Sequence, residues 1–298
     1  MTTASTAPAE GFRILAVHAH PDDESSKGAG TMLRYLSEGA RVMVATMTGG
    51  ERGSVLNANV AAEPMAARDL AGMRIMEMAE AARHLGVEHR WIGFADSGLP
   101  EGDPLPPLPA GCFGALPLEQ ASAPLIRLVR SFRPHVILAY DENGGYPHPD
   151  HIMSHRVAME AYQRAGDPDA YPGLGEPWAP SKLYYDRGFS PERFTTYHET
   201  LLKETGESPF TEWLSMLDQP KPESWITYET TTRIDVGPFI EKREDALKAH
   251  RTQIDPESTF FALSAEKQRE VWPWEDYILA DSRVETSLPE TDLLAGLR

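Results

Sequence analysis

The sequence contains one cysteine, Cys112, among its 298 residues. A single thiol excludes an internal disulfide, and it excludes a zinc knuckle built from several cysteine ligands. Chains that fold in a reducing compartment have little need for disulfides, so we expect a cytoplasmic location.

Long apolar runs and excess positive charge are also missing. No run approaches the roughly 20 apolar residues that a membrane-spanning helix needs. Lys and Arg number 28 against 45 Asp and Glu, a formal charge of −17, so a polyanionic partner would meet net repulsion. We therefore expect neither nucleic acid nor a membrane as a partner. The first eleven residues lack a signal-peptide pattern and are predicted to form a disordered leader.

Short apolar runs alternate with amphipathic segments along the first half of the chain. This alternation is typical of an α/β protein with a Rossmann-like, doubly wound and mainly parallel sheet that is flanked by helices. The clearest amphipathic helix is expected over 65–85. Strands are expected over 13–19, 41–46, 88–94 and 135–140, with further helices ending near 38, 132 and 165.

The composition changes after residue 165, where proline, glycine and aromatic residues become frequent. We predict a Rossmann-like catalytic domain over 12–165 and a C-terminal α+β lobe over 166–298 that completes the sheet and covers the active site. The long proline-rich loop over 95–117 is interpreted as a pocket wall. Within the lobe we expect strands at 182–186 and 231–236, helices near 190–205, 209–217 and 237–250, and then an irregular tail.

A cluster of metal-ligand side chains, His20-Pro21-Asp22-Asp23-Glu24, follows the first predicted strand directly. A catalytic zinc site takes three protein ligands and leaves one position open for water. His20 and Asp23 are three residues apart, close enough on a tight loop to reach one ion. Asp22 then points elsewhere, where it could serve as a general base. Glu24 is expected to favour the start of the following helix.

A second cluster, Tyr146-Pro147-His148-Pro149-Asp150-His151, lies far along the chain, after the predicted strand 135–140. Three histidines there fall at helical spacings of three and four residues, so they could share one face of a helix. One of them completes the metal shell. His151, in the first turn, is the better candidate for this ligand, and His148 is then left to contact the substrate carbonyl. His155, one turn further along the helix, could replace His151 as the ligand.

Two other classes of protein fit part of this pattern. Two histidines and a carboxylate also describe the site of a non-haem iron oxygenase. A sugar-binding module that kept the fold without catalysis is the second alternative. The alternation of strands and helices and the unligated Asp22 favour a hydrolase over both.

The two clusters resemble, without a gap, the paired signature of the zinc-dependent N-acetylglucosaminyl-phosphatidylinositol de-N-acetylase (LmbE-like) superfamily. The resemblance extends over nearly the whole chain after residue 12. Further motifs resemble the mycothiol S-conjugate amidase branch of that superfamily in particular. They lie at 48–53, 96–103, 140–146 and 249–255.

The resemblance implies a role for each matching residue. His20, Asp23 and His151 would bind zinc, and Asp22 would act as the general base. Tyr146 and His148 would stabilise the oxyanion that develops during amide hydrolysis, and Asp150 would orient His148. Iron(II) suits the same ligands and is the alternative metal.

The substrate that the resemblance implies is a small molecule, glucosaminyl-inositol joined by an amide to an S-substituted N-acetylcysteine. Its hydrolysis would release a mercapturic acid in thiol-based detoxification. The alternative is deacetylation of N-acetylglucosaminyl-inositol in mycothiol biosynthesis. A polyhydroxyl ligand needs fixed hydrogen-bonding groups. The candidates are Lys27, Glu51, Arg74, Asp96, His250 and Gln253.

Overall fold

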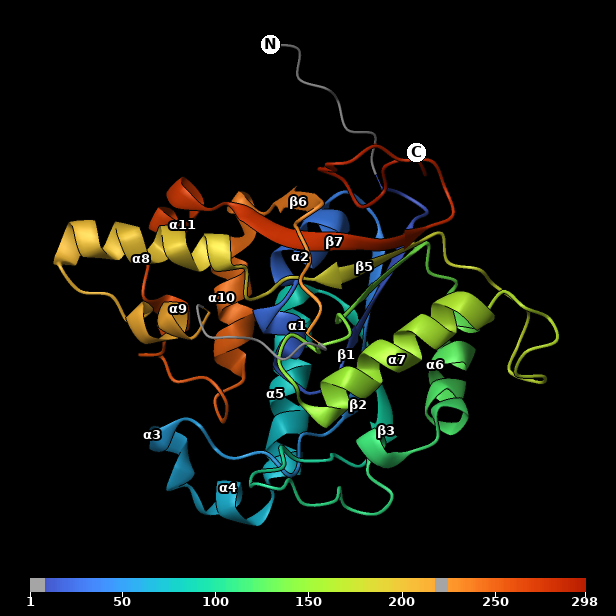
Figure 1. Cartoon of the computed structure of the whole chain (residues 1–298), viewed down its shortest axis with the longest axis horizontal. Helices are drawn as coiled ribbons and strands as arrows, with labels where there is room; N and C mark the ends of the chain where they lie inside the picture. Colours follow the sequence, from blue (N-terminus) through green and yellow to red (C-terminus); the bar gives the residue numbers. More distant parts are fainter. Residues whose placement is uncertain (1–8, 218–224) are drawn as a thin grey trace, which may run out of the picture.

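A seven-stranded sheet runs through the molecule with helices on both faces (Figure 1). The computed structural model describes residues 9–217 and 225–298. The strand order is β3-β2-β1-β4-β5-β7-β6, in which the first five strands are parallel and β7 runs antiparallel to both neighbours. The predicted doubly wound, mainly parallel α/β fold is therefore confirmed. The strands are β1 (Arg13–His18), β2 (Arg41–Thr48), β3 (Glu88–Phe94), β4 (Val136–Ala139), β5 (Lys182–Asp186), β6 (Thr232–Asp235) and β7 (Trp274–Ser282).

The helices that cover the sheet come mostly from the segments between its parallel strands. Those in the first half of the chain are α1 (Asp23–Ser26), α2 (Ala29–Ser37), α3 (Ala58–Ala61), α4 (Pro64–Arg68), α5 (Leu70–Leu85), α6 (Leu118–Phe132) and α7 (Pro149–Arg164). Those in the second half are α8 (Pro191–Thr205), α9 (Thr211–Leu217), α10 (Ile240–Ala249) and α11 (Ala265–Val271).

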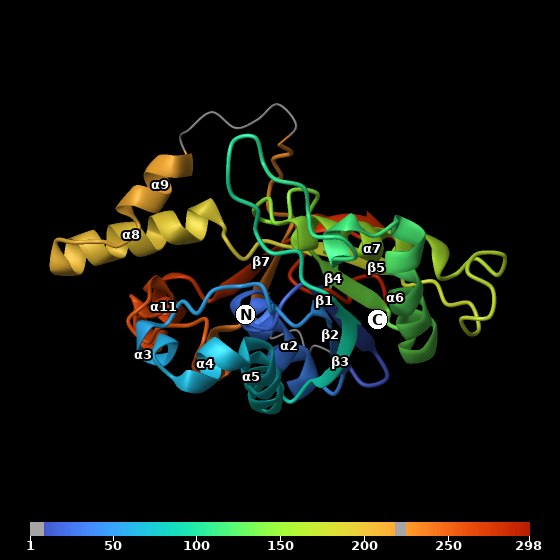
Figure 2. The same ribbon diagram turned by 90° about the horizontal axis from the view of Figure 1, so that it is seen from below.

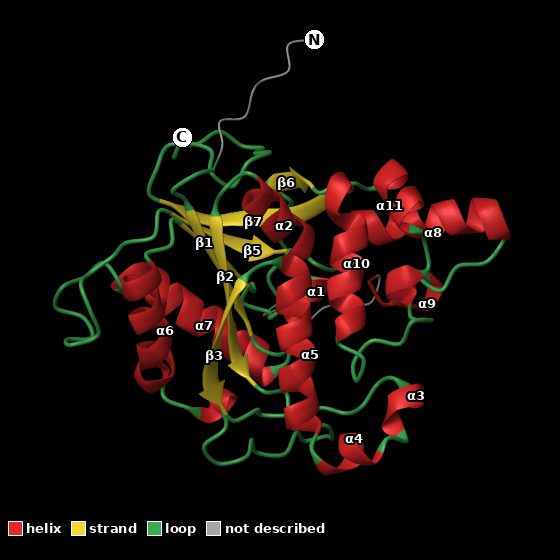
Figure 3. Ribbon diagram, turned by 180° about the vertical axis from the view of Figure 1, so that it is seen from behind, coloured by secondary structure: helices red, strands yellow, loops and turns green. Residues whose placement is uncertain are grey.

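Alternate residues of the central strand β1 pack into two different cores. Ile14 and Ala16 belong to the cluster formed with α2, α5 and α10. Leu15 and Val17 face the other way and belong to the cluster formed with α6 and α7. Figure 3 shows these two groups of helices on opposite sides of the sheet. A strand buried on both faces reads as a continuous apolar run, which is why β1 was recognisable in the sequence.

Two helices expected to be continuous are each broken by a local backbone constraint. The helix predicted to end near residue 38 divides at Gly28, which has a φ of 80° and begins α2. The helix predicted over 65–85 divides at Asp69, whose Oδ1 accepts the Gly72 amide at 2.8 Å and caps α5. An aspartate that satisfies a free amide favours a new helix start over continuation.

The prediction of an irregular tail was wrong, because this part of the chain forms α11 and β7. The strand carries acidic residues that are paired rather than solvated, so its sequence does not show a simple alternation. Glu275 accepts the amides of Gly30 and Thr31, at 3.0 and 2.8 Å, at the start of α2. Arg233 on β6 donates to Asp276 at 3.1 Å. These pairs stabilise a strand that could not be predicted from the sequence pattern alone.

The lobe that follows α7 supplies β5, β6 and β7 to the same sheet. Its helices α8 and α9 stand away from the sheet (Figure 2). They pack with the segment around α11 in a third apolar cluster. Its buried members are Tyr197, Leu201, Phe210, Leu263 and Trp272.

Most of the predicted leader, residues 1–8, lies outside the described residues. Ala9 is buried, and its amide donates to Glu38 O at 2.7 Å. Within the described ranges, no helix is long and apolar enough to cross a membrane.

A buried ion pair fastens the C-terminal segment to β5. Lys182 Nζ lies 2.5 Å from Glu290 Oε1, and both side chains are at most 1% exposed. The other oxygen of Glu290 accepts the Tyr184 hydroxyl at 2.6 Å. Loss of either charge would leave the other buried without an opposite charge beside it.

We expect Glu290→Ala to lower the free energy of unfolding by about 3–5 kcal/mol, because it leaves the Lys182 ammonium buried and unpaired. Urea denaturation followed by circular dichroism measures this loss. The Arg41–Glu88 pair is the matched control, with side chains 61% and 40% exposed. Glu88→Ala should cost at most about 1 kcal/mol. Equal losses in the two variants would contradict a structural role for the buried pair.

Candidate metal centre and active site

The two clusters singled out in the sequence meet at one edge of the sheet. β1 and β4 are parallel neighbours, so the loops that follow them emerge side by side. His20 lies in the loop after β1, and Asp23 is the first residue of α1. His148 is the N-cap of α7, and His151 lies in its first turn.

Three candidate ligand atoms converge at this edge. His20 Nδ1 lies 3.6 Å from Asp23 Oδ2 and 3.3 Å from His151 Nε2. His151 Nε2 lies 3.6 Å from the same oxygen of Asp23. Ligand atoms of a tetrahedral zinc ion, with bonds of about 2.0–2.1 Å, lie roughly 3.3–3.4 Å apart. The donor set and its spacing therefore fit a zinc ion.

The hydrogen bonds of the two histidines direct their lone pairs toward that position. His20 Nε2 contacts Asp150 Oδ2 at 3.3 Å, and His151 Nδ1 contacts Gly144 O at 2.8 Å. Because both acceptors are oxygens without a proton, these ring nitrogens are the donors. The opposite nitrogens then carry the free lone pairs, as metal-binding histidines require. Gly144 is needed here, since its φ is 71° and a Cβ would lie 2.7 Å from the His151 Cβ.

Asp23 is buried and ionised. Burial alone would raise the pKa of its carboxyl, but the adjacent Lys27 ammonium holds that pKa well below its usual range. Lys27 Nζ donates to Asp23 Oδ1, so Oδ2 is left facing the two histidines. Lys27, predicted to contact substrate, is thus engaged with a candidate ligand and also borders the cavity described below.

Asp22 is paired with Arg74 and not with these ligand atoms. Its backbone has a φ of 115°, unusual for a residue with a side chain, and the side chain is 24% exposed. Burial raises the pKa of its carboxyl, and the Arg74 guanidinium, 3.4 Å away, opposes that rise. The Asp22 carboxyl therefore holds a proton more readily than a free aspartate does.

A buried pair fixes the backbone of Asp22. Glu24 Oε2 accepts the Asp22 amide at 3.0 Å, and Glu24 Oε1 accepts His250 Nε2 at 2.7 Å. His250 and Glu24 are both fully buried, so His250 faces this carboxylate and not the cavity. Gln253 donates to Ser54 O at 3.0 Å. Contact of His250 and Gln253 with substrate stays a prediction.

The other residues predicted to bind substrate lie on the β2 and β3 side of the ligands. Arg74 donates to Gly50 O and Pro21 O, at 3.0 and 2.5 Å. A Cβ on Gly50 would lie 2.4 Å from the Arg74 Cζ, so glycine there makes room for this side chain. Asp96 is buried, and its amide donates to Glu51 Oε1 at 2.8 Å.

His148 and Tyr146 stand beside the candidate ligands. The ring centroid of Tyr146 lies 4.6 Å from that of His151, and its side chain is 40% exposed. Burial and the charge of Asp23 raise the pKa of Tyr146 to about 12, so its hydroxyl keeps its proton near neutral pH. His148 Nδ1 accepts the Asp150 amide at 3.1 Å, which leaves Nε2 as its donor. His155 turns away, with Nδ1 3.0 Å from Tyr140 O.

The Asp150 carboxylate has partners that the sequence analysis missed. Besides His20, it accepts the amide of Ser97 at 2.9 Å and the Ser97 hydroxyl. Its link to His148 runs through the backbone amide and not through the carboxylate. Ser97 follows the end of β3, but nothing in the sequence distinguishes it from another loop serine.

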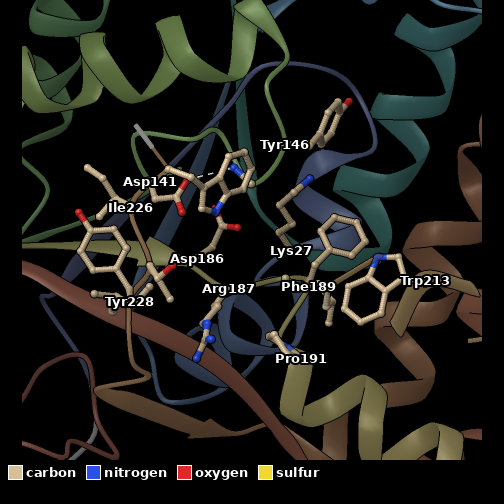
Figure 4. Close-up of a pocket in the computed structure, with 16 residues that line it drawn as sticks. Lys27, Asp141, Tyr146, Asp186, Arg187, Phe189, Pro191, Trp213, Ile226 and Tyr228 are labelled. Carbon is tan, nitrogen blue, oxygen red and sulfur yellow. Dashed lines mark hydrogen bonds between the residues drawn. The ribbon is translucent and has the colours of Figure 1, made fainter. Parts of the chain in front are cut away.

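A cavity of 310 Å³ is lined in part by Lys27 and Tyr146, two residues that contact candidate ligands (Figure 4). Lys27 and Tyr146 border it on the side of the metal centre. Most of its remaining wall comes from the lobe that follows α7, and the sequence does not distinguish these residues as part of a site. They include Asp186, Phe189, Trp213, Ile226 and Tyr228.

The chain is similar to several known proteins. The model of the family described as PIG-L, GlcNAc-PI de-N-acetylase, matches residues 15–162. A mycothiol S-conjugate amidase from Streptomyces coelicolor is 51% identical, over 96% of this chain and 98% of that protein. A 1D-myo-inositol 2-acetamido-2-deoxy-alpha-D-glucopyranoside deacetylase from Streptomyces scabiei is 40% identical, over 96% and 90%. The solved structure of N,N'-diacetylchitobiose deacetylase from Pyrococcus horikoshii shares the fold, with a TM-score of 0.59 and 19% identity over 90% and 83%.

Fold, site and relatives together define a hydrolase that acts on an amide bond. The chain belongs to the GlcNAc-PI de-N-acetylase (PIG-L) family, as its paired motifs predicted. Neither an iron oxygenase nor a non-catalytic sugar-binding module fits that membership.

The contact between Glu24 and the Asp22 amide predicts a positioning role for Glu24. Glu24→Ala should lower kcat about 10²-fold at unchanged metal content, because a misplaced general base costs about that much. Glu24→Gln keeps an acceptor for the amide and should retain most activity. Steady-state kinetics with metal analysis measures both. A stability loss in Glu24→Ala without a change in kcat would reduce Glu24 to a purely structural residue.

Proposed function

We propose that this chain is a zinc-dependent amidase that hydrolyses mycothiol S-conjugates to an N-acetylcysteine S-conjugate and glucosaminyl-inositol. The convergence of the His20, Asp23 and His151 ligand atoms beside an unligated Asp22 supports the chemistry. The relative from Streptomyces coelicolor, at 51% identity over almost the full length of both proteins, supports the substrate. We place this reaction of a small-molecule substrate in the cytoplasm.

His20, Asp23 and His151 would hold the metal, with iron(II) as the alternative for the same donor set. When bound there, zinc supplies a Lewis acid for the amide carbonyl and lowers the pKa of water to about 7. Asp22 then takes the proton of the attacking water. Its raised pKa suits this task, since a stronger base holds the proton better.

His148 and Tyr146 would donate to the oxyanion of the tetrahedral intermediate. The hydrogen bond from the Asp150 amide to Nδ1 supports a neutral His148 with its proton on Nε2. Tyr146, with its pKa raised to about 12, is a second donor. One such donor is typically worth about 2.7–4 kcal/mol. Protonated Asp22 can return its proton to the leaving amine, since His148 already serves as a neutral donor.

The alternative activity is deacetylation of N-acetylglucosaminyl-inositol. The relative from Streptomyces scabiei, at 40% identity, carries the name of such a deacetylase. Both reactions cleave an amide on the same glucosaminyl-inositol and would use the same ligands and base. They differ in the acyl group, which is an acetyl in one and an S-substituted N-acetylcysteinyl group in the other.

Asp22 and Asp23 are neighbours with different proposed roles, so variants of the two residues should differ in metal content and in kcat. Asp22→Asn should retain zinc but lose about 10²–10⁴-fold in kcat, because no base remains beside the ligands. Asp23→Ala should lose zinc affinity, since it removes one of three ligands. Metal analysis after dialysis, together with kcat, measures the difference. Near wild-type turnover in Asp22→Asn would refute the general-base role.

A side-by-side comparison of two substrates tests the proposed reaction. The zinc-loaded protein should hydrolyse a bimane-type mycothiol conjugate with a higher kcat/KM than N-acetylglucosaminyl-inositol. Release of the amine is measured for both substrates, and Asp22→Asn provides the inactive control. A clear preference for the second substrate would favour the deacetylase, and turnover of neither would contradict both reactions.

A further inference from the structure

Part of the lining of this cavity is apolar and contains none of the residues that we propose for catalysis. Phe189 and Trp213 lie on one side of the cavity and Ile226 and Tyr228 on the other; we call these four residues together the aromatic wall (Figure 4). Phe189 is 37% exposed and Ile226 is 43% exposed, so both present apolar surface to the cavity. Apolar surface that lines a concave site is typical of a ligand pocket.

The aromatic wall is supported from behind by α8. Phe194, on that helix, lies with its ring centroid 4.5 Å from Trp213 and 6.1 Å from Phe189. The Phe189 and Phe194 rings are nearly parallel, at 16°. On the other side of the cavity, Tyr228 donates to Glu142 Oε2 at 2.7 Å. The wall is thus held by packing and by hydrogen bonding in the absence of ligand.

A carboxylate also lines the same cavity. Asp186 lies at the end of β5, and its Oδ2 is buried without a hydrogen-bond partner among the described residues. An unsatisfied buried acceptor is costly, so it is suited to a donor that arrives with a ligand. Lys27 does not fill this place, because its ammonium donates to Asp23.

The strand order places polar and apolar groups on opposite sides of the candidate ligands. The ligands follow β1 and α7 begins after β4, at the middle of the order β3-β2-β1-β4-β5. Arg74, Glu51 and Asp96 lie toward β2 and β3, where they suit a polyhydroxyl group. Asp186 and the aromatic wall lie toward β5. A substrate whose amide carbonyl sits at the ligands would therefore place chemically different halves on the two sides.

We propose that the cavity is a subsite for the acyl half of the substrate. An apolar S-substituent packs against the aromatic wall, and Asp186 accepts the N–H of the N-acetylcysteinyl group. This inference rests on the proposed amidase function and deepens it. An acetyl group would leave most of the 310 Å³ unfilled, whereas an aryl thioether with its N-acetyl group is large and apolar enough to use the space. The subsite therefore selects conjugates of bulky apolar electrophiles.

Trp213→Ala tests the aromatic wall with two conjugates, one carrying bimane and one carrying a methyl group on sulfur. The variant should lose at least tenfold in kcat/KM for the bimane conjugate, because contacts with the ring are removed, and stay within twofold for the methyl conjugate. Trp91→Ala is the matched control, since Trp91 is 36% exposed on β3 at the far edge of the sheet. It should change neither value.

Substitution of Asp186 gives an independent test, because it leaves the four residues of the aromatic wall unchanged. Asp186→Ala should lower kcat/KM for both conjugates, which share the N-acetyl group, and leave N-acetylglucosaminyl-inositol hydrolysis within twofold. Asp186→Asn retains an acceptor oxygen and should restore most of the loss. Equal losses on all three substrates would overturn the role of Asp186.

The outcomes distinguish a failure of the proposed subsite from a failure of the proposed function. If the wild-type protein hydrolyses neither conjugate, the amidase proposal itself fails. If it hydrolyses both but Trp213→Ala leaves their ratio unchanged, the aromatic wall does not bind the S-substituent and the amidase proposal stands. Parallel losses on the bimane and methyl conjugates in Trp213→Ala would likewise overturn the subsite.

Discussion

The buried carboxylate of Asp23 is the constraint on which the site depends. A charge removed from water is stable only when it is paired. Lys27 pairs with one oxygen, and the other faces His20 and His151. Lys27 can reach Asp23 because the chain after β5 has Gly188, where a Cβ would lie 2.8 Å from the Lys27 Cγ. The Asp23 charge thereby brings together the loop after β1, the first turn of α7 and the lobe that follows α7.

The side chains around Asp23 point in different directions, and each direction has a cause. Asp22 is turned outward by a left-handed backbone that is anchored through its amide. Glu24 turns inward, where His250 lowers its pKa to about 2 against the opposing effect of burial. The expectation that Glu24 mainly favours a helix start therefore gives only part of its role. The motif divides metal binding, proton transfer and backbone support among adjacent residues.

The sequence predicted the parallel half of the sheet and the candidate ligands because both have local signals. Buried parallel strands are apolar runs, and ligands that follow such strands cluster within a few residues. Contacts between distant segments lack such a signal. Glu24 and His250 are 226 residues apart, and the cavity combines Lys27 with Phe189 and Trp213 from a different part of the chain. β7 was missed because its acidic residues have partners on α2 and β6, so their charge did not indicate exposure.

The position of β7 affects the order in which the protein can be completed during synthesis. β7 lies between β5 and β6 in the sheet, yet it follows both of them in the sequence. Until β7 has been made, β5 is an edge strand, and its backbone groups opposite Tyr277, Ile278 and Leu279 have no partner on that side. Unpaired apolar edges promote association with other chains. The nascent chain therefore has a period in which association with other chains is favoured, and this period ends only once β7 has been made.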